Sequence, residues 1–322
     1  MSDQILTREL GAGGPRVGAI GLGCMGMSWA YDPSQRDDDA SVQVIHRALD
    51  LGVTLIDTSD VYGPFHNEEL VGRALRDRRE RAVLATKGGL IADLSGDHPE
   101  IKRNGRPEHL REALDASLER LGTDHVDLYQ LHRVDPDVPI EESWGAMAEA
   151  VAAGKARAIG MSEATVDELD RAQAIHPVAS LQSELSLWTR DPLGDVLPWC
   201  ERNGAAFIPF APLGRGFLTG AQAGASYEDT DFRARNPRFT RDAVAANQAI
   251  VEQVRAVADR IDAAPGQVAL AWTLAQGDHV VPIPGTKRIA YLEENAAAAR
   301  VELSASDLEA LDALPAAVGA RY

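Results

Sequence analysis

The sequence has few cysteines, no long apolar run and a shortage of basic residues. Among its 322 residues only Cys24 and Cys200 are cysteines, too few for a disulfide framework, which favours a reducing compartment. The longest apolar runs, such as Val53–Ile56, have the length of a strand, whereas a membrane span needs about 18 residues. The opening stretch MSDQILTREL has no apolar segment after a basic start, so no secretory signal is expected. We therefore expect a cytoplasmic protein.

Acidic residues outnumber basic residues by 49 to 32, which gives a formal net charge of −17. A surface this acidic repels nucleic acid and anionic membranes, so we expect neither as a partner. An anionic cofactor would need its charge met by a few local Lys or Arg side chains. The position of each basic residue is therefore informative. The sequence gives no indication of an oligomeric state.

Eight short segments rich in Val, Ile and Leu alternate with amphipathic segments. The eight lack apolar–polar alternation, as expected of strands that are buried on both faces. Between them helices are predicted, most clearly over 107–121 and 241–261, where apolar residues form one stripe. This order predicts an α/β fold, a (β/α)8 TIM barrel in which residues 1–322 form a single domain. The predicted strands are residues 17–21, 53–57, 82–87, 126–131, 157–161, 178–182, 206–210 and 279–283.

Further elements are predicted at the ends of the chain and in the connections. Residues 7–10 and 16–20 could pair as an N-terminal β-hairpin, and a helical tail is expected at the C-terminus. Asn67, followed by two glutamates, has the pattern of a helix N-cap. Two long irregular stretches, 88–106 and 214–240, follow the third and seventh strands. Barrel enzymes carry their active sites at the carboxyl ends of strands, so we expect both stretches to border the site.

The stretch GLGCMG, residues 21–26, has the G-x-G-x-x-G spacing of a dinucleotide-binding turn. A Rossmann turn also needs a helix that starts inside the motif and an acidic residue about 20 residues further on. Here Pro33 and a polar cluster follow the motif, and the next predicted strand ends at Asp57, 31 residues after Gly26. The sequence therefore favours a glycine-rich first β/α turn, where small residues let a ligand approach the backbone.

Four residues capable of proton chemistry lie at the ends of three successive predicted strands. Asp57 ends the second strand and Tyr62 follows it, Lys87 ends the third strand, and His132 follows the fourth. In a barrel these side chains would converge at one mouth. A lysine ammonium lowers the pKa of a neighbouring phenol, and a carboxylate can hold that ammonium in place. The tyrosine could then act as a general acid, while the imidazole orients a carbonyl oxygen or helps to relay the proton.

The chain resembles the aldo-keto reductase superfamily in the motifs IDTSDVYG, LATKGG, DLYQLH, IGMSEA, LQSELSLW, PFAPLGRGFLTG and VPIPGTKR. It is most similar to the bacterial and plant branch with pyridoxal-reductase-like and auxin-induced-like members, and the resemblance runs from GLGCMG to LEEN. The resemblance implies NADPH-dependent reduction of an aldehyde or ketone on a TIM barrel. It also implies a catalytic tetrad of Asp57, Tyr62, Lys87 and His132, and it makes the spacing of the glycine motif an accident.

The same resemblance implies where the cofactor NADPH binds. Ser162 and Gln182 would hydrogen-bond the carboxamide, and Phe210 would stack on the nicotinamide ring. Arg215 and its glycine neighbours would wrap the pyrophosphate, while a cation pair at a helix start would hold the 2′-phosphate. The implied cofactor contacts are Gly23, Cys24, Met25, Asp57, Ser162, Gln182, Phe210, Pro212, Leu213, Gly214, Arg215, Gly216, Gly285, Thr286, Lys287, Arg288, Glu294 and Asn295.

Two positions depart from the pattern of many relatives. Glu163 stands where an Asn often follows the carboxamide serine, and Tyr291 stands where other branches carry an Arg. The phosphate clamp therefore depends on Lys287 and Arg288. No metal is expected, because neither cysteine lies at metal-ligand spacing from a His.

The substrate pocket is expected to be bounded by Trp29, Tyr62, His132 and the 88–106 stretch, with Trp188 as a further wall. Two indoles favour aromatic or bulky apolar carbonyls, and aromatic aldehydes, pyridoxal, sugar-derived ketones and natural-product ketones all stay open.

Two other functions also stay open. In a Schiff-base aldolase barrel Lys87 would be the nucleophile, although Asp57 and Tyr62 would then lack a role. A barrel that binds NADPH tightly and serves mainly as a partner subunit would show little turnover, and no sequence feature marks such a partner.

Overall fold

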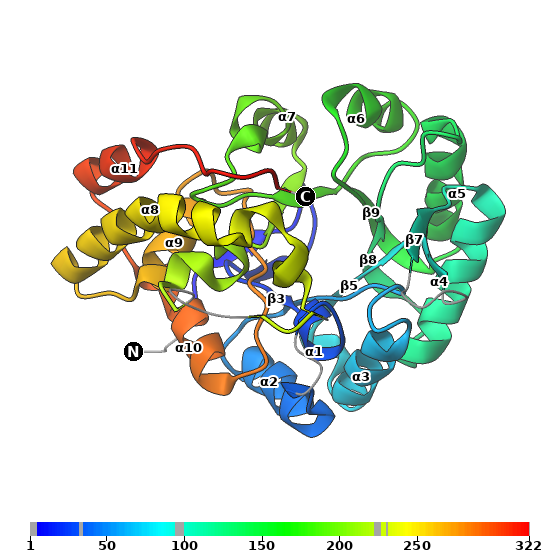
Figure 1. Ribbon diagram of the computed structural model, residues 1–322. Coiled ribbons are helices and arrows are strands. Elements are labelled where there is room, and N and C mark those ends of the chain that lie inside the picture. Colours follow the sequence, from blue (N-terminus) through cyan, green and yellow to red (C-terminus); the bar gives the residue numbers. More distant parts are fainter. Residues whose placement is uncertain (1–4, 32–34, 94–99, 222–226, 230, 322) are drawn as a thin grey trace.

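The computed structural model describes residues 5–31, 35–93, 100–221, 227–229 and 231–321, and these contain a central sheet of seven parallel strands (Figure 1). The spatial order is β11-β10-β9-β8-β5-β4-β3, so neighbours along the chain are neighbours in the sheet. Two strands, β8 and β11, have the predicted bounds. The strands are β3 (Leu22–Gly23), β4 (Leu55–Asp57), β5 (Val83–Gly88), β8 (Val126–Leu131), β9 (Ala156–Ser162), β10 (Ser180–Glu184) and β11 (Ala206–Phe210).

Residues 279–285 fill the eighth position and close the barrel between β11 and β3. Backbone hydrogen bonds of 2.8 to 3.0 Å join this segment to β11. On its other side the Gly21 N–H donates to the Pro282 carbonyl at 2.9 Å. Pro282 and Pro284 have no N–H, so the segment cannot form a regular ladder, and the predicted strand 279–283 is irregular for this reason. The predicted (β/α)8 barrel is confirmed.

An antiparallel hairpin, β1 (Thr7–Glu9) with β2 (Arg16–Gly18), precedes the barrel, as predicted. The prediction that residues 17–21 form the first barrel strand was wrong, because 17–18 belong to the hairpin and the barrel strand is β3. The apolar run is continuous here, so its pattern does not separate the two. The Arg8 guanidinium donates to the carbonyls of Leu274 and Gly277 at 2.9 and 2.6 Å, which ties the hairpin to the amino end of the barrel.

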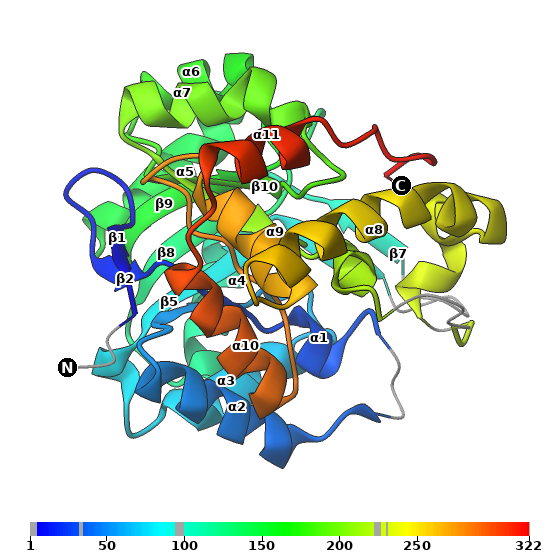
Figure 2. The same cartoon turned by 90° about the vertical axis from the view of Figure 1, so that its left-hand side faces the viewer.

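The helices surround the sheet, and Figure 2 shows α11 and the irregular C-terminal segment crossing beside α8 and α9. Helix α4 has the predicted bounds because Pro107 occupies its first turn and Gly122 ends it in the left-handed conformation, at φ 65°. No helix in the described part of the chain is long and apolar enough to cross a membrane. The helices are α1 (Met25–Ser28), α2 (Asp38–Asp50), α3 (His66–Leu75), α4 (Pro107–Leu121), α5 (Ile140–Ala152), α6 (Val166–Gln173), α7 (Val196–Asn203), α8 (Arg241–Arg260), α9 (Pro265–Leu274), α10 (Ile289–Ala297) and α11 (Ala305–Asp312).

Asn67 is not the N-cap of α3, which was a wrong prediction. The helix begins at His66, with Phe65 at the cap position two residues before Asn67, so Asn67 lies inside the first turn. Its fully buried side chain accepts a hydrogen bond from Thr58 Oγ1 at 2.7 Å and donates to the Cys24 carbonyl at 2.9 Å. Asn67 therefore ties the first β/α turn to the second.

The two stretches predicted to be irregular contain ordered structure. The first holds an antiparallel hairpin, β6 (Leu90–Asp93) with β7 (Glu100–Arg103), and its residues 94–99 lie outside the described residues. The second consists largely of short 3-10 turns, and its residues 222–226 and 230 lie outside the described residues. These turns are η4 (Gly214–Thr219), η5 (Phe232–Arg235) and η6 (Pro237–Phe239).

The first glycines of the GLGCMG motif are packing positions at the barrel closure. A Cβ on Gly21 would lie 2.9 Å from Ile283 Cγ2, and a Cβ on Gly23 would lie 2.9 Å from the Ile283 carbonyl oxygen. Since backbone cannot move aside as a side-chain tip can, Gly23 is the more restricted of the two. These contacts explain the glycines without a phosphate.

We expect Gly23→Ala to lower the free energy of unfolding by about 1–3 kcal/mol, because the added methyl group overpacks the closure. Urea unfolding measures the change. Gly145→Ala is the matched control, since an added Cβ on this α5 residue meets no atom within 4 Å. There the gain in helix propensity should stabilise the protein by about 0.5–1 kcal/mol. Equal effects of the two substitutions would contradict the packing explanation.

Candidate functional site

The site is the polar top layer of the barrel interior. Leu55 and Ala85 belong to an apolar cluster that fills the barrel. Because side chains along a strand alternate with period two, Asp57 and Lys87 point into the same interior one layer higher. Strand β10 adds Gln182, its middle residue, to this layer. The predicted strand ends therefore bring their polar side chains together.

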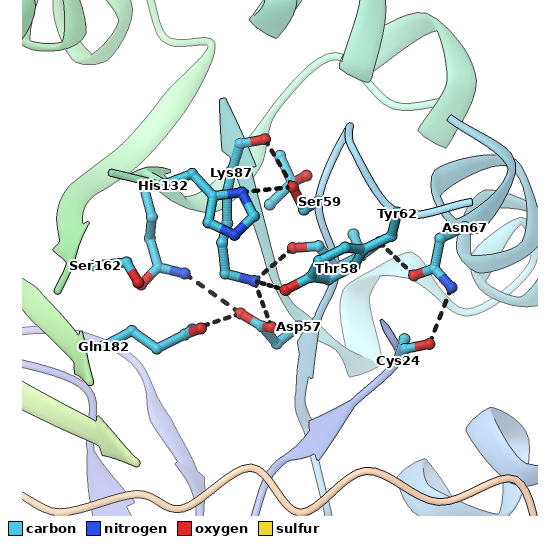
Figure 3. Close-up of polar contacts among 12 residues, drawn as sticks. Cys24, Asp57, Thr58, Ser59, Tyr62, Asn67, Lys87, His132, Ser162 and Gln182 are labelled. Atoms are coloured by element: carbon cyan, nitrogen blue, oxygen red, sulfur yellow. Dashed lines mark hydrogen bonds and ion pairs between the residues drawn. The ribbon is translucent and has the colours of Figure 1, made fainter. Parts of the chain in front are cut away.

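Lys87 joins an acid and a phenol (Figure 3). Its Nζ donates to Asp57 Oδ1 at 2.6 Å, to the Thr58 carbonyl at 2.8 Å and to Tyr62 Oη at 3.3 Å. Lys87 is fully buried and Tyr62 is only 8% exposed, so the ammonium has no contact with bulk water. The ammonium is held by a carboxylate on one side and lies against the Tyr62 oxygen on the other.

Burial raises the pKa of the Tyr62 phenol above its ordinary value, and the Lys87 ammonium opposes this shift without reversing it. Burial acts to lower the pKa of Lys87, but Asp57 and Tyr62 together hold that pKa above its ordinary value. Lys87 acts to lower the phenol's pKa, as expected, but the net shift is upward because desolvation of the phenolate is the larger effect. Tyr62 therefore keeps its proton near neutral pH, and Lys87 keeps its charge.

The second oxygen of Asp57 is also fully engaged. Gln182 Nε2 donates to Asp57 Oδ2 at 2.8 Å, and Gln130 Nε2 donates to the same oxygen at 3.3 Å. Gln182 was expected to contact the cofactor, and the structure gives its amide nitrogen a protein partner. Gln130 was missed, although it follows Leu128 at the period-two spacing that also places Asp57 and Lys87.

His132 lies next to Tyr62, with the two rings edge to face and their centroids 5.8 Å apart. Its Nδ1 is 3.1 Å from Ser59 Oγ, and Figure 3 shows Nε2 on the side that faces the head groups of Lys87 and Tyr62. Burial lowers the pKa of His132 well below its ordinary value, and the charges of Lys87 and Arg133 act in the same direction. The imidazole is therefore neutral, and its two nitrogens have different roles.

Ser162 and Trp29 lie near this pair. Arg133, which no sequence signal singled out, donates through Nη1 to Ser162 Oγ at 2.9 Å and to the His132 carbonyl at 2.6 Å. The ring of Trp29 lies 5.9 Å from that of Tyr62, centroid to centroid. Trp29 is thus adjacent to the phenol, as expected of a wall of the substrate pocket.

The first β/α turn borders Asp57. The Cys24 N–H donates to the Asp57 carbonyl at 2.9 Å, and Met25 begins α1. Gly23 pairs with Gly285 across the barrel closure. The three residues expected beside the nicotinamide are therefore contiguous with the polar layer.

A second group of charges lies at the carboxyl ends of β9, β10 and β11. Arg215, in the left-handed conformation at φ 58°, donates to Glu184 Oε2 at 3.2 Å. Glu184, which was missed, also has Arg238 at 3.8 Å and Arg321 at 3.6 Å. Arg321, near the end of the chain, pairs with Glu163 as well. The cation expected at the pyrophosphate therefore shares a carboxylate with two other arginines.

The residues expected around that cation form one short segment. Phe210 ends β11, and η4 begins at Gly214, with Gly216 at φ 89°. Pro212 and Leu213 connect the two elements.

The expected 2′-phosphate site lies at the start of α10. Arg288 occupies the cap position, its N–H donates to Thr286 Oγ1 at 3.1 Å, and its guanidinium lies 5.4 Å from the centre of the Tyr291 ring. Lys287 precedes it and is partly exposed. Further along the helix, the Glu294 carbonyl accepts from Gln267 on α9 at 3.1 Å, and Asn295 is buried.

Trp188 packs below the η4 loop. It is 5% exposed and stacks on Phe217 with ring centroids 4.7 Å apart, and a Cβ on Gly214 would come within 2.7 Å of it. These contacts are those of a core side chain. The assignment of Trp188 to the substrate pocket stays a prediction.

Residues 19–316 match the family model described as the aldo/keto reductase family. The chain is 42% identical to the probable aldo-keto reductase 1 of Glycine max over 324 residues, which is 99% of this chain and 92% of the relative. It is 42% identical to aldo-keto reductase yakc [NADP(+)] of Schizosaccharomyces pombe over 329 residues, covering 99% and 95%.

Two solved structures extend the comparison. The glycerol dehydrogenase AKR11B4 of Gluconobacter oxydans is 29% identical, with a TM-score of 0.86 over 97% of this chain and 95% of that one. An aldo/keto reductase of Klebsiella pneumoniae, solved with NADP and acetate, is 27% identical, with a TM-score of 0.71 over 95% and 94%.

Proposed function

Since the chain belongs to the aldo/keto reductase family, we propose that it reduces an aldehyde or ketone to the alcohol, with Tyr62 as the proton donor. It is an NADP-dependent oxidoreductase, and NADP(H), which supplies the hydride when bound, is the cofactor of this family. The observation that carries the assignment of Tyr62 is the set of contacts from Lys87 Nζ to Asp57 Oδ1 and Tyr62 Oη, at 2.6 and 3.3 Å.

The donors around the mouth fit a phosphorylated dinucleotide. Ser162 offers a hydroxyl and Gln182 an amide oxygen, which suit a carboxamide. Arg215, Lys287 and Arg288 offer charge, and in a chain of net charge −17 such cations suit the phosphates. The start of α10 adds the partial positive charge of a helix N-terminus. We propose these residues as the cofactor contacts.

Each member of the tetrad has a distinct role in the proposed proton transfer. Tyr62 is protonated in the resting site and gives its proton to the oxygen of the substrate as the alcohol forms. The Lys87 ammonium stabilises the phenolate that remains, and Asp57 keeps this ammonium in position. None of the described residues binds His132 Nε2, so this nitrogen is left to orient the carbonyl oxygen.

The contacts of Lys87 also bear on the aldolase alternative. A Schiff-base lysine must lose its proton before it attacks a carbonyl. Here the ammonium donates three hydrogen bonds, and its neighbours hold its pKa above the ordinary value. The site therefore favours proton transfer over imine formation.

The test is the loss of NADPH absorbance in the presence of a reactive aromatic aldehyde such as 4-nitrobenzaldehyde. We expect steady consumption of NADPH and formation of the alcohol. Tight NADPH retention without turnover would instead support a partner subunit. Trapping of a carbonyl substrate on Lys87 by borohydride would support an aldolase.

The double variant Lys287→Gln, Arg288→Gln is expected to weaken NADPH binding by about 10–100-fold, because charge-assisted hydrogen bonds to the 2′-phosphate are lost. NADH, which lacks this phosphate, should be almost unaffected. Fluorescence titration with each cofactor measures both affinities. Lys155→Gln, which removes one exposed lysine paired with Asp115, controls for the loss of a positive charge elsewhere on the surface. Equal losses for NADPH and NADH would contradict the assignment.

For the substrate we propose an aromatic or bulky apolar carbonyl compound, bounded by Trp29, Tyr62 and His132. The support is the position of the Trp29 ring beside the phenol. Comparison of kcat/KM for benzaldehyde and a short aliphatic aldehyde tests this preference.

A further inference from the structure

His132 has a buried hydrogen-bond chain behind it, on the side opposite the proposed substrate. Ser59 Oγ is 3.1 Å from His132 Nδ1 and 3.0 Å from Asp60 Oδ1, and Figure 3 shows the contact between Ser59 and His132. The three side chains are 0% (Ser59), 4% (Asp60) and 6% (His132) exposed. Neither Ser59 nor Asp60 has a role in the tetrad.

The Ser59 hydroxyl has one proton, so it can donate a hydrogen bond to only one neighbour. Its other contacts are longer: the Lys87 carbonyl at 3.5 Å, and the Val61 N–H, which donates to Ser59 Oγ at 3.4 Å. The choice therefore lies between Asp60 Oδ1 and His132 Nδ1, and the protonation state of Asp60 decides it.

When Asp60 is ionised, its carboxylate accepts a hydrogen bond from the Ser59 hydroxyl. Ser59 Oγ then accepts a hydrogen bond from His132 Nδ1–H, and Nε2 has only a lone pair. When Asp60 is protonated, its O–H donates to Ser59 Oγ, and Ser59 donates to His132 Nδ1. The imidazole proton is then on Nε2. The two states differ by one proton, which is added at Nε2 while the Nδ1 proton shifts through Ser59 to Asp60.

We propose that Asp60, acting through Ser59, is a positioning residue that selects the tautomer of His132. It thereby decides whether Nε2 can donate a hydrogen bond to the carbonyl oxygen of the substrate. This consequence for catalysis rests on the proposed function, whereas the coupling between Asp60 and His132 rests on the contacts alone.

The surroundings of Asp60 raise the pKa of its carboxyl group into the neutral range. Burial and the charge of Glu68 raise the pKa of Asp60 to about 7, against the hydrogen bonds from Ser59 and Val61 and the charge of Arg120. The titratable and charged groups around Asp60 are Glu68 on α3, His109 and Arg120 on α4, Lys87 on β5, Tyr129 on β8 and His132 after β8.

Asp60 also borders a route for proton exchange. A cavity of about 110 Å³ is lined by Asp60, His109 and Arg120, among others, and such a volume can hold water. Burial lowers the pKa of His109, so the cavity holds a neutral imidazole. Among the described residues none binds His109 Nε2, which is buried. Asp60 can therefore exchange its own proton with water in this cavity, while the proton that distinguishes the two states is added at His132 Nε2.

The proposal predicts the direction of the pH dependence. Below about pH 7 Asp60 is protonated, and His132 presents the Nε2–H that carbonyl reduction uses. As the pH rises through that value the donor is lost, and kcat/KM for reduction should fall at least about tenfold to a lower plateau. In Asp60→Asn and Ser59→Ala this inflection should disappear, because the titrating group or its connection to His132 is gone.

The matched control for the pH profiles is Glu69→Gln, which removes an exposed carboxylate next to Glu68 on the same helix and should keep the inflection. An inflection that persists in both Asp60→Asn and Ser59→Ala would overturn the proposal. If Asp60→Asn fails to fold, Ser59→Ala and the spectroscopic measurement on the unmodified protein still test the proposal.

The spectroscopic measurement follows the ring nitrogens of His132 by ¹⁵N NMR in the NADP⁺ complex, from about pH 6 to about pH 8.5. We expect the Nε2–H tautomer to give way to the Nδ1–H tautomer with an apparent pKa near that of Asp60. A tautomer that does not change with pH would overturn the proposal. A tautomer that changes in a protein that reduces no carbonyl would uphold the coupling and refute the proposed function instead.

Discussion

Replacing Tyr62 with phenylalanine is expected to lower kcat for carbonyl reduction by about 10²–10⁴-fold, the usual contribution of a general acid. The substitution removes the oxygen that lies 3.3 Å from Lys87 Nζ and leaves the ring in place. The affinity for NADPH should stay within about threefold of the wild-type value, because the hydroxyl is assigned to the substrate rather than the cofactor. Steady-state assays with an aromatic aldehyde and cofactor titration measure the two quantities.

Tyr129→Phe is the control for this substitution. Tyr129 is also buried, and its hydroxyl donates to the Leu110 carbonyl at 3.1 Å, away from Lys87. Its loss should cost about 1 kcal/mol of stability with no change in kcat. Full activity in Tyr62→Phe would refute the catalytic assignment while leaving the family membership intact.

The second large effect is expected for Lys87→Met, in the free energy of unfolding as well as in activity. The substitution removes the cation of a fully buried pair and leaves Asp57 as a buried, uncompensated charge. Breaking such a pair costs about 3–5 kcal/mol, so urea denaturation should show a large shift of the midpoint. Activity should fall below that of Tyr62→Phe, because phenolate stabilisation and the position of Asp57 are both lost.

A double-mutant cycle with Asp57→Asn separates the pair from its surroundings. If the cost of Lys87→Met comes from the stranded carboxylate, the double variant should lose much less stability than the sum of the two single variants. Costs that simply add would mean that the two side chains do not stabilise each other.

The proposed tetrad could be predicted from sequence because its members lie at or just beyond the ends of neighbouring strands. Once the parallel order of β4, β5 and β8 is inferred, barrel geometry brings Asp57, Lys87 and the residue after Leu131 to one mouth. The chemical types of the side chains then limit what the site can do. This inference needs strand order but no side-chain conformations.

The partners of these residues could not be predicted in the same way. Ser59 binds His132, and Arg133 binds Ser162, only because particular rotamers place their polar atoms within 3.1 and 2.9 Å. Asn67 was assigned to a helix cap from its neighbours in sequence, but its amide instead binds residues of the first two β/α turns. Contacts across the barrel depend on side-chain direction, which the period of the hydrophobic pattern does not contain.

The closure of the barrel by residues 279–285 has a consequence for synthesis on the ribosome. Strand β3 is completed early, yet the backbone that binds its outer edge follows after most of the chain has been made. Until then β3 and β11 are open edges of an unfinished sheet, and open edges are sites of intermolecular pairing. Cotranslational folding of this chain therefore ends with a late closing step. A ribosome stalled before residue 285 would expose a nascent chain that can aggregate, or bind a chaperone, through those two strands.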